Sequence, residues 1–411
     1  MSEHGTLSNR VDESAKASRV RHARRAVTAA FMAHAMLFAS WTAHIPQIKS
    51  DLGISNATLG TALLGAPLGS VTAMVISRWL LPRVGSQRMI QITVVGYALA
   101  GISVGVVSSV VQLFAALAVW GLFQGGLDVA MNTQGVTVEK ALGSPIMSRL
   151  HGMWSVGGLT GALVGAGAAT IGVGLSVQLL VMGVIALTVV EALSRSLLDD
   201  QASTEERGST TAVDGPGRQA SVSVAVAVLG GVSFASMLCE GAAADWSANY
   251  LRSELGATAG LAGLGYAGYT AMMVVMRLSG TSLQARFPAR RLLPLLAAMP
   301  VVGMSLALVT SSPVVGLIGF ASMGIGLALV VPTAFSAAGD ATRGSANAGA
   351  SIATVAALGW IGYVSGPPLI GHLAELAGLR PALIVLPVLA GVIALTISLT
   401  TAFSGPDAHK L

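Results

Sequence analysis

Three polar side chains, Gln124, Asp128 and Asn132, stand four residues apart inside an otherwise apolar stretch. This spacing places them along one side of a helix. A carboxylate is costly in the middle of a membrane and is retained where it faces water or a partner. A carboxyl group removed from water also takes up a proton more readily. We interpret Asp128 as the proton-binding group of a central cavity and its two neighbours as solute contacts. The alternative is a carboxylate held permanently by the backbone or by a neighbouring side chain.

A second pair of acids, Glu240 and Asp245, is followed directly by Trp246. Glu240 precedes Arg252 by 12 residues, which places it near the middle of a membrane span. Five residues turn a helix by about 140°, so we expect the two acids to face different walls. Glu240 is the candidate for proton coupling and for substrate binding. Asp245 and Trp246 lie nearer the outer end of the span, where a role in a gate and contact with a solute are both open.

His151 and Trp154 are three residues apart and so share one side of a helix. An imidazole can donate, accept or carry a proton, and an indole offers a flat surface to a ring-shaped ligand. Both are candidates for substrate binding; the alternative is a histidine bonded to a loop carbonyl and a tryptophan packed in the bundle. His44 is a further binding candidate near the outer boundary, and His34 is deeper and alone. No His or Cys cluster exists in the sequence, so we expect no metal and no cofactor.

The composition is that of a membrane protein. Of 411 residues, 53% are hydrophobic and only 10% are charged, and the mean hydropathy is +0.74. A soluble domain of this size needs more charge on its surface. The single cysteine, Cys239, excludes an intramolecular disulfide. The 50 glycines suit closely packed helices in lipid. We expect close helix contacts at Gly121, Gly125, Gly126, Gly157, Gly161, Gly165, Gly362 and Gly366.

Twelve apolar segments with about the length of a membrane-spanning helix follow one another along the chain. They predict an all-α membrane protein with twelve transmembrane helices in two pseudo-symmetric bundles of six. The segments are 26–48, 55–80, 88–109, 112–137, 147–171, 173–194, 222–250, 257–281, 291–311, 313–337, 347–371 and 379–403.

The basic residues are distributed unevenly between the two ends of these segments. If the N-terminus is cytoplasmic, all 23 lysines and arginines except Lys49, Arg252 and Arg380 fall on the cytoplasmic side, Arg277 among them. This positive-inside pattern predicts that both termini are cytoplasmic and that the chain is a multi-pass protein of the inner (plasma) membrane. The basic pI near 9.7 therefore belongs to one membrane face and does not indicate a nucleic-acid partner.

A polar stretch at 195–220 divides the segments six and six and is typical of a flexible cytoplasmic linker. The halves also repeat, because Gly69–Arg78 and Gly268–Arg277 share their end residues and a central Met-Val pair. Parallel repeats of six helices with a substrate site between them are one build of secondary transporter. The expected units are an N-terminal tail (1–25), a first bundle (26–194), the linker (195–220), a second bundle (221–403) and a C-terminal tail (404–411).

Four motifs carry a resemblance to a known family. With twelve predicted helices in two halves and a basic turn after the second, the chain resembles the major facilitator superfamily along essentially its whole length. The motifs look like those of the fucose-permease branch, and more closely an uncharacterised bacterial inner-membrane subgroup of it. Fucose permeases are proton symporters with an acidic residue on helix 4 that binds the coupling proton, and the resemblance gives that role to Asp128. The matching stretches are Gly126–Asn132, Leu150–Gly157, Cys239–Trp246 and Gly366–Gly371.

Two departures from the family pattern limit what the resemblance implies. The loop between helices 2 and 3 normally has an acid before its basic residue, but Pro82 stands there, ahead of Arg83 and Arg88. These two arginines stay candidates for a gate, without the usual ion pair from that acid. The fucose permease also has an acid on helix 1, where this chain offers His34 and His44. Sugar specificity therefore does not carry over.

The function expected from these features is secondary active transport of a small, polar solute by proton-coupled symport. Efflux by proton antiport is the alternative, although an aromatic content of only 5% leans towards a small polar solute. A membrane sensor that moves no solute is a second alternative, and it would be expected to carry a sizeable signalling domain. No nucleophile–base pair or metal constellation in the sequence indicates an enzyme. The expected partners are the solute, protons and the lipid bilayer, and the expected state is a monomer.

Overall fold

The computed structural model describes residues 3–144, 146–199, 224–341, 348–400 and 402–403, and these ranges are helical with no strand. The first half contains α1 (Glu3–Trp41), η1 (Thr42–His44), α2 (Ile45–Leu52), α3 (Asn56–Leu63), α4 (Gly65–Val104), α5 (Val110–Leu142), α6 (Met147–Thr170) and α7 (Leu175–Ser194). The second half contains α9 (Val224–Ser253), α10 (Ala259–Arg286), α11 (Ala289–Val309), α12 (Pro313–Leu327), α13 (Val330–Ala341), α14 (Ala348–Ala377), α15 (Leu379–Ala382) and α16 (Val385–Leu399).

Ten segments of the described chain are long and apolar enough to cross a membrane. One of them, Asn56–Val104, has 49 residues and contains Gly85, whose φ of 78° and ψ of 157° interrupt the helix. Glycine adopts this conformation without a steric penalty, so α4 changes direction there. A crossing takes about 20 residues, and this segment has the length for two. The prediction of twelve crossings therefore requires that this segment crosses the membrane twice. It also requires one crossing by α6, which has 24 residues and is not among the ten segments.

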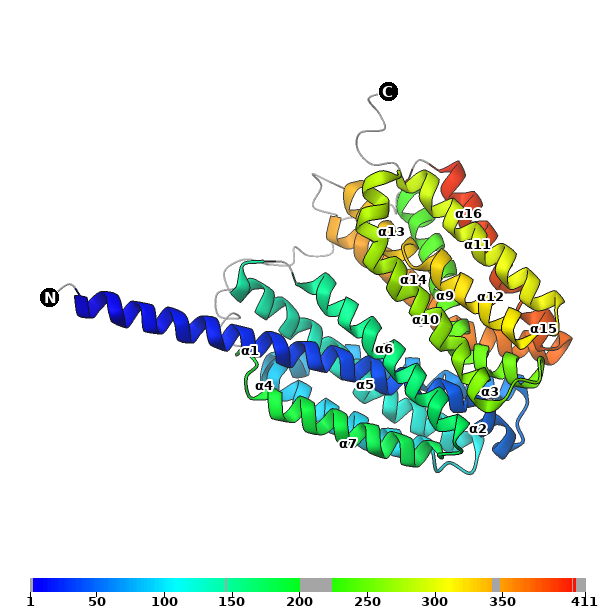
Figure 1. The fold of residues 1–411 in the computed structure, drawn as a ribbon, viewed down its shortest axis with the longest axis horizontal. Helices are drawn as coiled ribbons and strands as arrows, with labels where there is room; N and C mark the ends of the chain where they lie inside the picture. The colour runs from blue at the N-terminus through cyan, green and yellow to red at the C-terminus, as the bar shows by residue number, and fades with distance from the viewer. Residues whose placement is uncertain (1–2, 145, 200–223, 342–347, 401, 404–411) are drawn as a thin grey trace, which may run out of the picture.

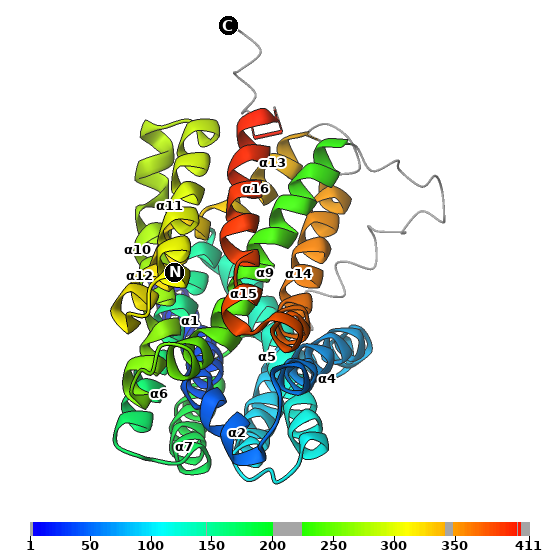
Figure 2. The ribbon, with the colours of Figure 1, turned by 90° about the vertical axis from the view of Figure 1, so that its right-hand side faces the viewer.

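The helices form two bundles, α1–α7 and α9–α16, which meet at one end and diverge towards the other (Figure 1). In the second view most of α9–α16 lies above α1–α7 (Figure 2). This arrangement confirms the predicted all-α fold in two bundles. Most of the linker predicted at 195–220, and the tail predicted at 404–411, lie outside the described residues.

Glycines allow the helices within each bundle to pack closely. On α6, a Cβ at Gly157, Gly161 or Gly165 would collide with the backbone of α1. On α5, Gly121 and Gly125 meet the backbone of α4 in the same way. The predicted close contacts at these glycines are confirmed, and they fix the helix faces that carry the polar residues.

The two bundles touch at the end that contains α2 and α3, where α3 packs on α14 and α6 packs on α10. A Cβ at Gly60 of α3 would meet the carbonyl of Pro367 and the backbone of Gly371 on α14. Asn249 Nδ2 of α9 also donates to Asn56 Oδ1 at 3.3 Å. This end is therefore closed by main-chain packing and an amide–amide hydrogen bond.

Candidate functional site

A small cavity lies between the bundles and brings together predicted site residues from both. Trp154 and Ser155 of α6 line it from one side, and Glu240 of α9 and Tyr266 of α10 line it from the other. Its volume of about 10 Å³ has room for about one water molecule. The structure thus places Glu240 and Trp154, which are far apart in the sequence, on one cavity.

A larger cavity of about 1060 Å³ lies at the end where the bundles diverge. His151 of α6 and Met237 of α9 line it together with Arg277 and Gln284 of α10. The start of α6 and the turn from α10 to α11 border it, so it opens at the end opposite the contact between α3 and α14. His151 also packs edge-on against Phe31, with 5.3 Å between the ring centroids.

Asp128 is half-buried on α5 and is bonded within its own helix. Asn132 Nδ2 donates to the Asp128 backbone carbonyl at 2.8 Å and to Asp128 Oδ1 at 3.3 Å. No cation contacts the carboxylate among the described residues. Gln124, one turn earlier, is also half-buried, so the three polar residues predicted on one side of this helix share the same partial exposure.

His34 orients Trp154, which lines the small cavity. The sequence alone does not reveal this role of His34. Trp154 Nε1 donates to His34 Nδ1 at 3.0 Å, and the backbone of Gln124 lies beside the same imidazole. Tyr97 donates its hydroxyl to the His34 carbonyl at 3.4 Å. The imidazole is buried, so it acts on the cavity through Trp154.

His44 belongs to a different part of the molecule. Its Nε2 is 2.8 Å from Gln178 Oε1, and Gln178 Nε2 donates to the Ser40 carbonyl at 2.9 Å. These bonds join α7 to the end of α1. His44 lines a separate cavity of about 830 Å³ at the end where the bundles meet, with Lys49 and Arg252. It is therefore not brought together with Glu240.

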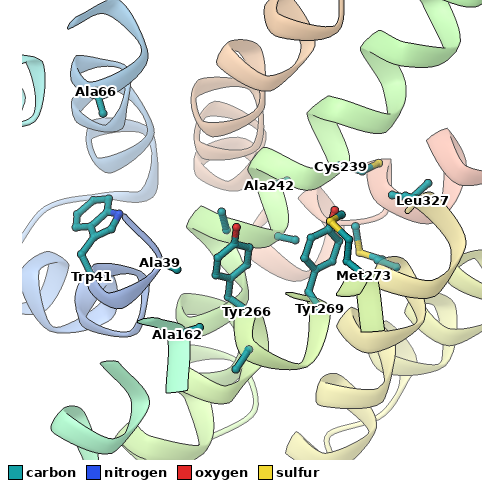
Figure 3. Close-up of a cluster of buried hydrophobic side chains, with 14 of the residues drawn as sticks. Ala39, Trp41, Ala66, Ala162, Cys239, Ala242, Tyr266, Tyr269, Met273 and Leu327 are labelled. Atoms are coloured by element: carbon teal, nitrogen blue, oxygen red, sulfur yellow. The ribbon is translucent and has the colours of Figure 1, made fainter. Parts of the chain in front are cut away.

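Asp245 and Trp246 are buried on α9. Trp246 packs on Gly371 of α14 at the end where the bundles meet. Asp245 and Glu240 both lie within electrostatic range of Tyr266, although five residues separate them on the helix. Tyr266 stacks on Tyr269 with 5.9 Å between the ring centroids, and both rings point the same way from α10 (Figure 3).

The two arginines predicted for a gate are exposed on α4. Arg83 Nη1 donates to the backbone carbonyl of Trp79 at 3.1 Å. Arg88 follows the interruption at Gly85. Neither arginine lines the two cavities that hold Glu240 and His151.

Arg277, which the positive-inside pattern counts on the cytoplasmic side, also belongs to the site. It is half-buried on α10, and its Nη1 donates to Ser155 Oγ of α6 at 3.3 Å. Glu240 and His151 lie within its electrostatic range. The helix continues for nine residues to Arg286, about 14 Å further along its axis. Arg277 therefore lies within the bundle contact, well inside the end of its helix.

Comparison with known proteins identifies the family. A family model described as the Major Facilitator Superfamily matches residues 228–410. The chain is 32% identical over 371 residues to an uncharacterised transporter of Sinorhizobium fredii, covering 90% of this chain and 96% of that protein. It is also 32% identical over 361 residues to an uncharacterised MFS-type transporter of Yersinia pestis, covering 86% and 89%. The chain belongs to the major facilitator superfamily.

The fold of this facilitator is similar to that of a solved transporter structure. The crystal structure of a bacterial homologue of the human lysosomal transporter Spinster, in an inward-facing and occupied conformation, aligns with a TM-score of 0.69. The identity is 14%, and the alignment covers 90% of this chain and 94% of that chain. The sequence relatives confirm the predicted superfamily, and the structural likeness confirms the predicted fold. The closer resemblance to fucose permeases stays a prediction.

Proposed function

We propose that this facilitator moves a small polar solute across the inner membrane by alternating access, with protons moving in the same direction. The observation that carries the proposal is the cavity shared by the two bundles. Glu240 of the second bundle faces Trp154 and Ser155 of the first bundle across it. A rocking motion of one bundle against the other would change the access to these residues without dismantling either bundle.

Asp128 and Glu240 are the proposed proton-binding groups. Each is an acid inside an apolar helix, where an ionised carboxylate is costly unless it faces water or a partner. Asp128 accepts a hydrogen bond from Asn132, and no cation bonds either acid among the described residues. Both carboxyl groups can therefore gain and lose a proton without breaking an ion pair.

The solute is proposed to bind beside these acids. Gln124, Asn132, His151 and Trp154 are its expected contacts in the first bundle. His151 lines the larger cavity, and Trp154 lines the small cavity that Glu240 shares. With the N-terminus cytoplasmic, the conformation described above is open to the cytoplasm, because the bundles meet at the opposite end.

Proteoliposomes loaded with the pH-sensitive dye pyranine test the proposal. A panel of small sugars, organic acids, nucleosides and amines is added outside, and acidification of the lumen is followed over time. We expect at least one solute to acidify the lumen, and the Glu240→Gln variant, which cannot carry a proton at this position, to lose that acidification. Entry of a radiolabelled solute from the panel with no acidification would refute proton symport. Alkalinisation on entry would instead identify antiport.

A further inference from the structure

Arg277 is a permanent positive charge inside the contact between the bundles. A guanidinium stays protonated at physiological pH, and a half-buried cation between two helix bundles needs polar partners. Arg277 is half-buried, lies about 14 Å from the end of α10, and lines the cavity of about 1060 Å³. This position predicts a functional role for Arg277, and its contacts indicate what kind of group it binds.

Within the described ranges, the contacts of Arg277 leave most of its hydrogen-bonding capacity unused. Nη1 donates to the neutral hydroxyl of Ser155 at 3.3 Å. Nε is buried and has no hydrogen-bond partner among the described residues. Glu240 lies within electrostatic range, but no ion pair joins it to Arg277 in this part of the chain. The cation therefore borders the cavity with an orphaned donor and without an acid in contact.

The unused side of the guanidinium has the geometry that a carboxylate requires. Nη1 lies on the side of Cδ, so Nε–H and Nη2–H point in the same direction. Two parallel N–H groups match the two oxygens of a carboxylate in a bidentate pair. Ser155 Oγ contacts the opposite side of the group through Nη1, which leaves the Nε–Nη2 edge for a ligand.

We propose that Arg277 binds a carboxylate group of the transported solute, so that the solute is a small organic acid. This inference rests on the proposed function, since it names the class of solute for the same cavity. Trp154 and Tyr266 line the adjoining small cavity and offer apolar ring surfaces to the remainder of the solute.

The same geometry links the solute to the proton. Ionised Glu240 attracts Arg277 and competes with a solute carboxylate for it, whereas protonated Glu240 does not. Proton binding at Glu240 and anion binding at Arg277 therefore favour each other, and by linkage the effect is reciprocal.

The other titratable groups around Arg277 and Glu240 are a histidine and tyrosines. A neutral imidazole and a protonated phenol carry no negative charge, so they do not compete for the guanidinium. Those within electrostatic range of Arg277 are His151, Tyr266 and Tyr269. Those within range of Glu240 are Tyr266, Tyr269 and Tyr363. Asp245 also lies within electrostatic range of Tyr266, but Glu240 is the acid that lies within range of Arg277 itself. Glu240 is therefore the acid that competes with the solute.

Equilibrium binding to the purified full-length protein in detergent tests the proposal. Three pairs of probes are used, in which an acid is matched with a neutral analogue: sodium gluconate with glucitol, sodium lactate with propane-1,2-diol, and sodium benzoate with benzyl alcohol. Thermal unfolding and quenching of tryptophan fluorescence report binding, at an ionic strength held constant with sodium chloride. Arg277→Gln removes the charge, and Arg277→Lys keeps the charge but loses the planar fork.

Arg78→Gln is the matched control, because Arg78 ends the corresponding repeat on α4 but is exposed. We expect at least one acid to bind the wild type, its neutral analogue to bind at least tenfold more weakly, and Arg277→Gln to lose at least tenfold in affinity. Arg277→Lys should lie between, and Arg78→Gln should match the wild type. The proposal is wrong if no acid binds the wild type, if the neutral analogues bind equally well, or if folded Arg277 variants keep wild-type affinity. Because the assay involves no transport, these outcomes are separate from a failure of proton symport in proteoliposomes.

Discussion

Trp154 of α6 donates its indole N–H to Nδ1 of His34 on α1, at a distance of 3.0 Å. Since Nδ1 accepts this bond, a neutral His34 must carry its proton on Nε2. The bond fixes the orientation of the indole that lines the small cavity opposite Glu240. His34 is therefore a positioning residue, which acts on the site through Trp154.

Replacing His34 by leucine should remove the acceptor of the Trp154 indole. A buried donor left without a partner costs about 1–3 kcal/mol, so we expect a lower unfolding temperature and several-fold weaker solute binding. His34→Gln offers a carbonyl oxygen in a similar place and should recover part of the affinity. Thermal unfolding and fluorescence titration measure both effects. Equal affinities of the leucine, glutamine and wild-type proteins would show that the bond does not position the indole.

Replacing Asp128 by asparagine should separate solute movement from proton movement. In the wild type, uptake should rise as the external pH falls, because protonation of a carboxyl group accompanies each cycle. In Asp128→Asn we expect no accumulation driven by a pH gradient and little dependence on pH, while counterflow exchange continues. Transport in proteoliposomes at a series of external pH values gives both quantities. Accumulation by the variant against a solute gradient would exclude Asp128 as the coupling residue.

His44 should matter for stability more than for binding. Its bond of 2.8 Å to Gln178 is buried, and loss of one partner costs about 1–3 kcal/mol. We expect His44→Ala and Gln178→Ala each to lower the unfolding temperature by several degrees and to leave solute affinity within about twofold. The two effects should be less than additive in the double variant, because both residues belong to one bond. A large loss of affinity in His44→Ala alone would return this residue to the binding site.

A larger side chain at Gly60 should oppose closure of the end where the bundles meet. A Cβ there would collide with the Pro367 carbonyl, so Gly60→Leu should shift the population away from the described conformation. Gly167→Leu on α6 is the control, because no atom lies within 4 Å of its Cβ position. Maleimide labelling of a Gln284→Cys probe in the larger cavity should be slower with Gly60→Leu and unchanged with the control, while the native Cys239 is buried. An equal labelling rate in both would refute the role of this contact.

Much of the fold could be predicted because membrane helices are long, apolar and separated by polar turns. The prediction differs from the structure where a turn is made without a polar loop: α4 continues through Pro82 and changes direction only at Gly85. Asp128 and Glu240 could be selected as site candidates because a carboxylate in an apolar membrane segment has a high free-energy cost. The bond from Trp154 to His34 was not found, because it joins residues 120 positions apart.

Arg277 lies deeper in its helix than hydropathy indicates. A decline in hydropathy marks the end of the apolar stretch, but the hydrogen-bonded helix runs on to Arg286. The predicted apolar segment 257–281 contains Arg277, and the helix runs five residues beyond the end of that segment. The polar residues that follow it within α10, Thr281 and Gln284, are the signal that the helix projects beyond that point.

The charges at the closed end of the molecule hold the bundles together only weakly. Lys49 of the first bundle lies within electrostatic range of Glu254 and Glu375 of the second, but no salt bridge joins them in the described ranges. Both acids are exposed, so water and salt screen this attraction.

The contact at that end consists of main-chain packing of α3 on α14, the packing of α6 on α10, and a hydrogen bond between the amides of Asn249 and Asn56. A contact of this kind, without an ion pair, favours neither the closed nor the open form strongly. We therefore expect the balance between the open and closed forms to depend on whether Asp128 and Glu240 hold protons and Arg277 holds the solute.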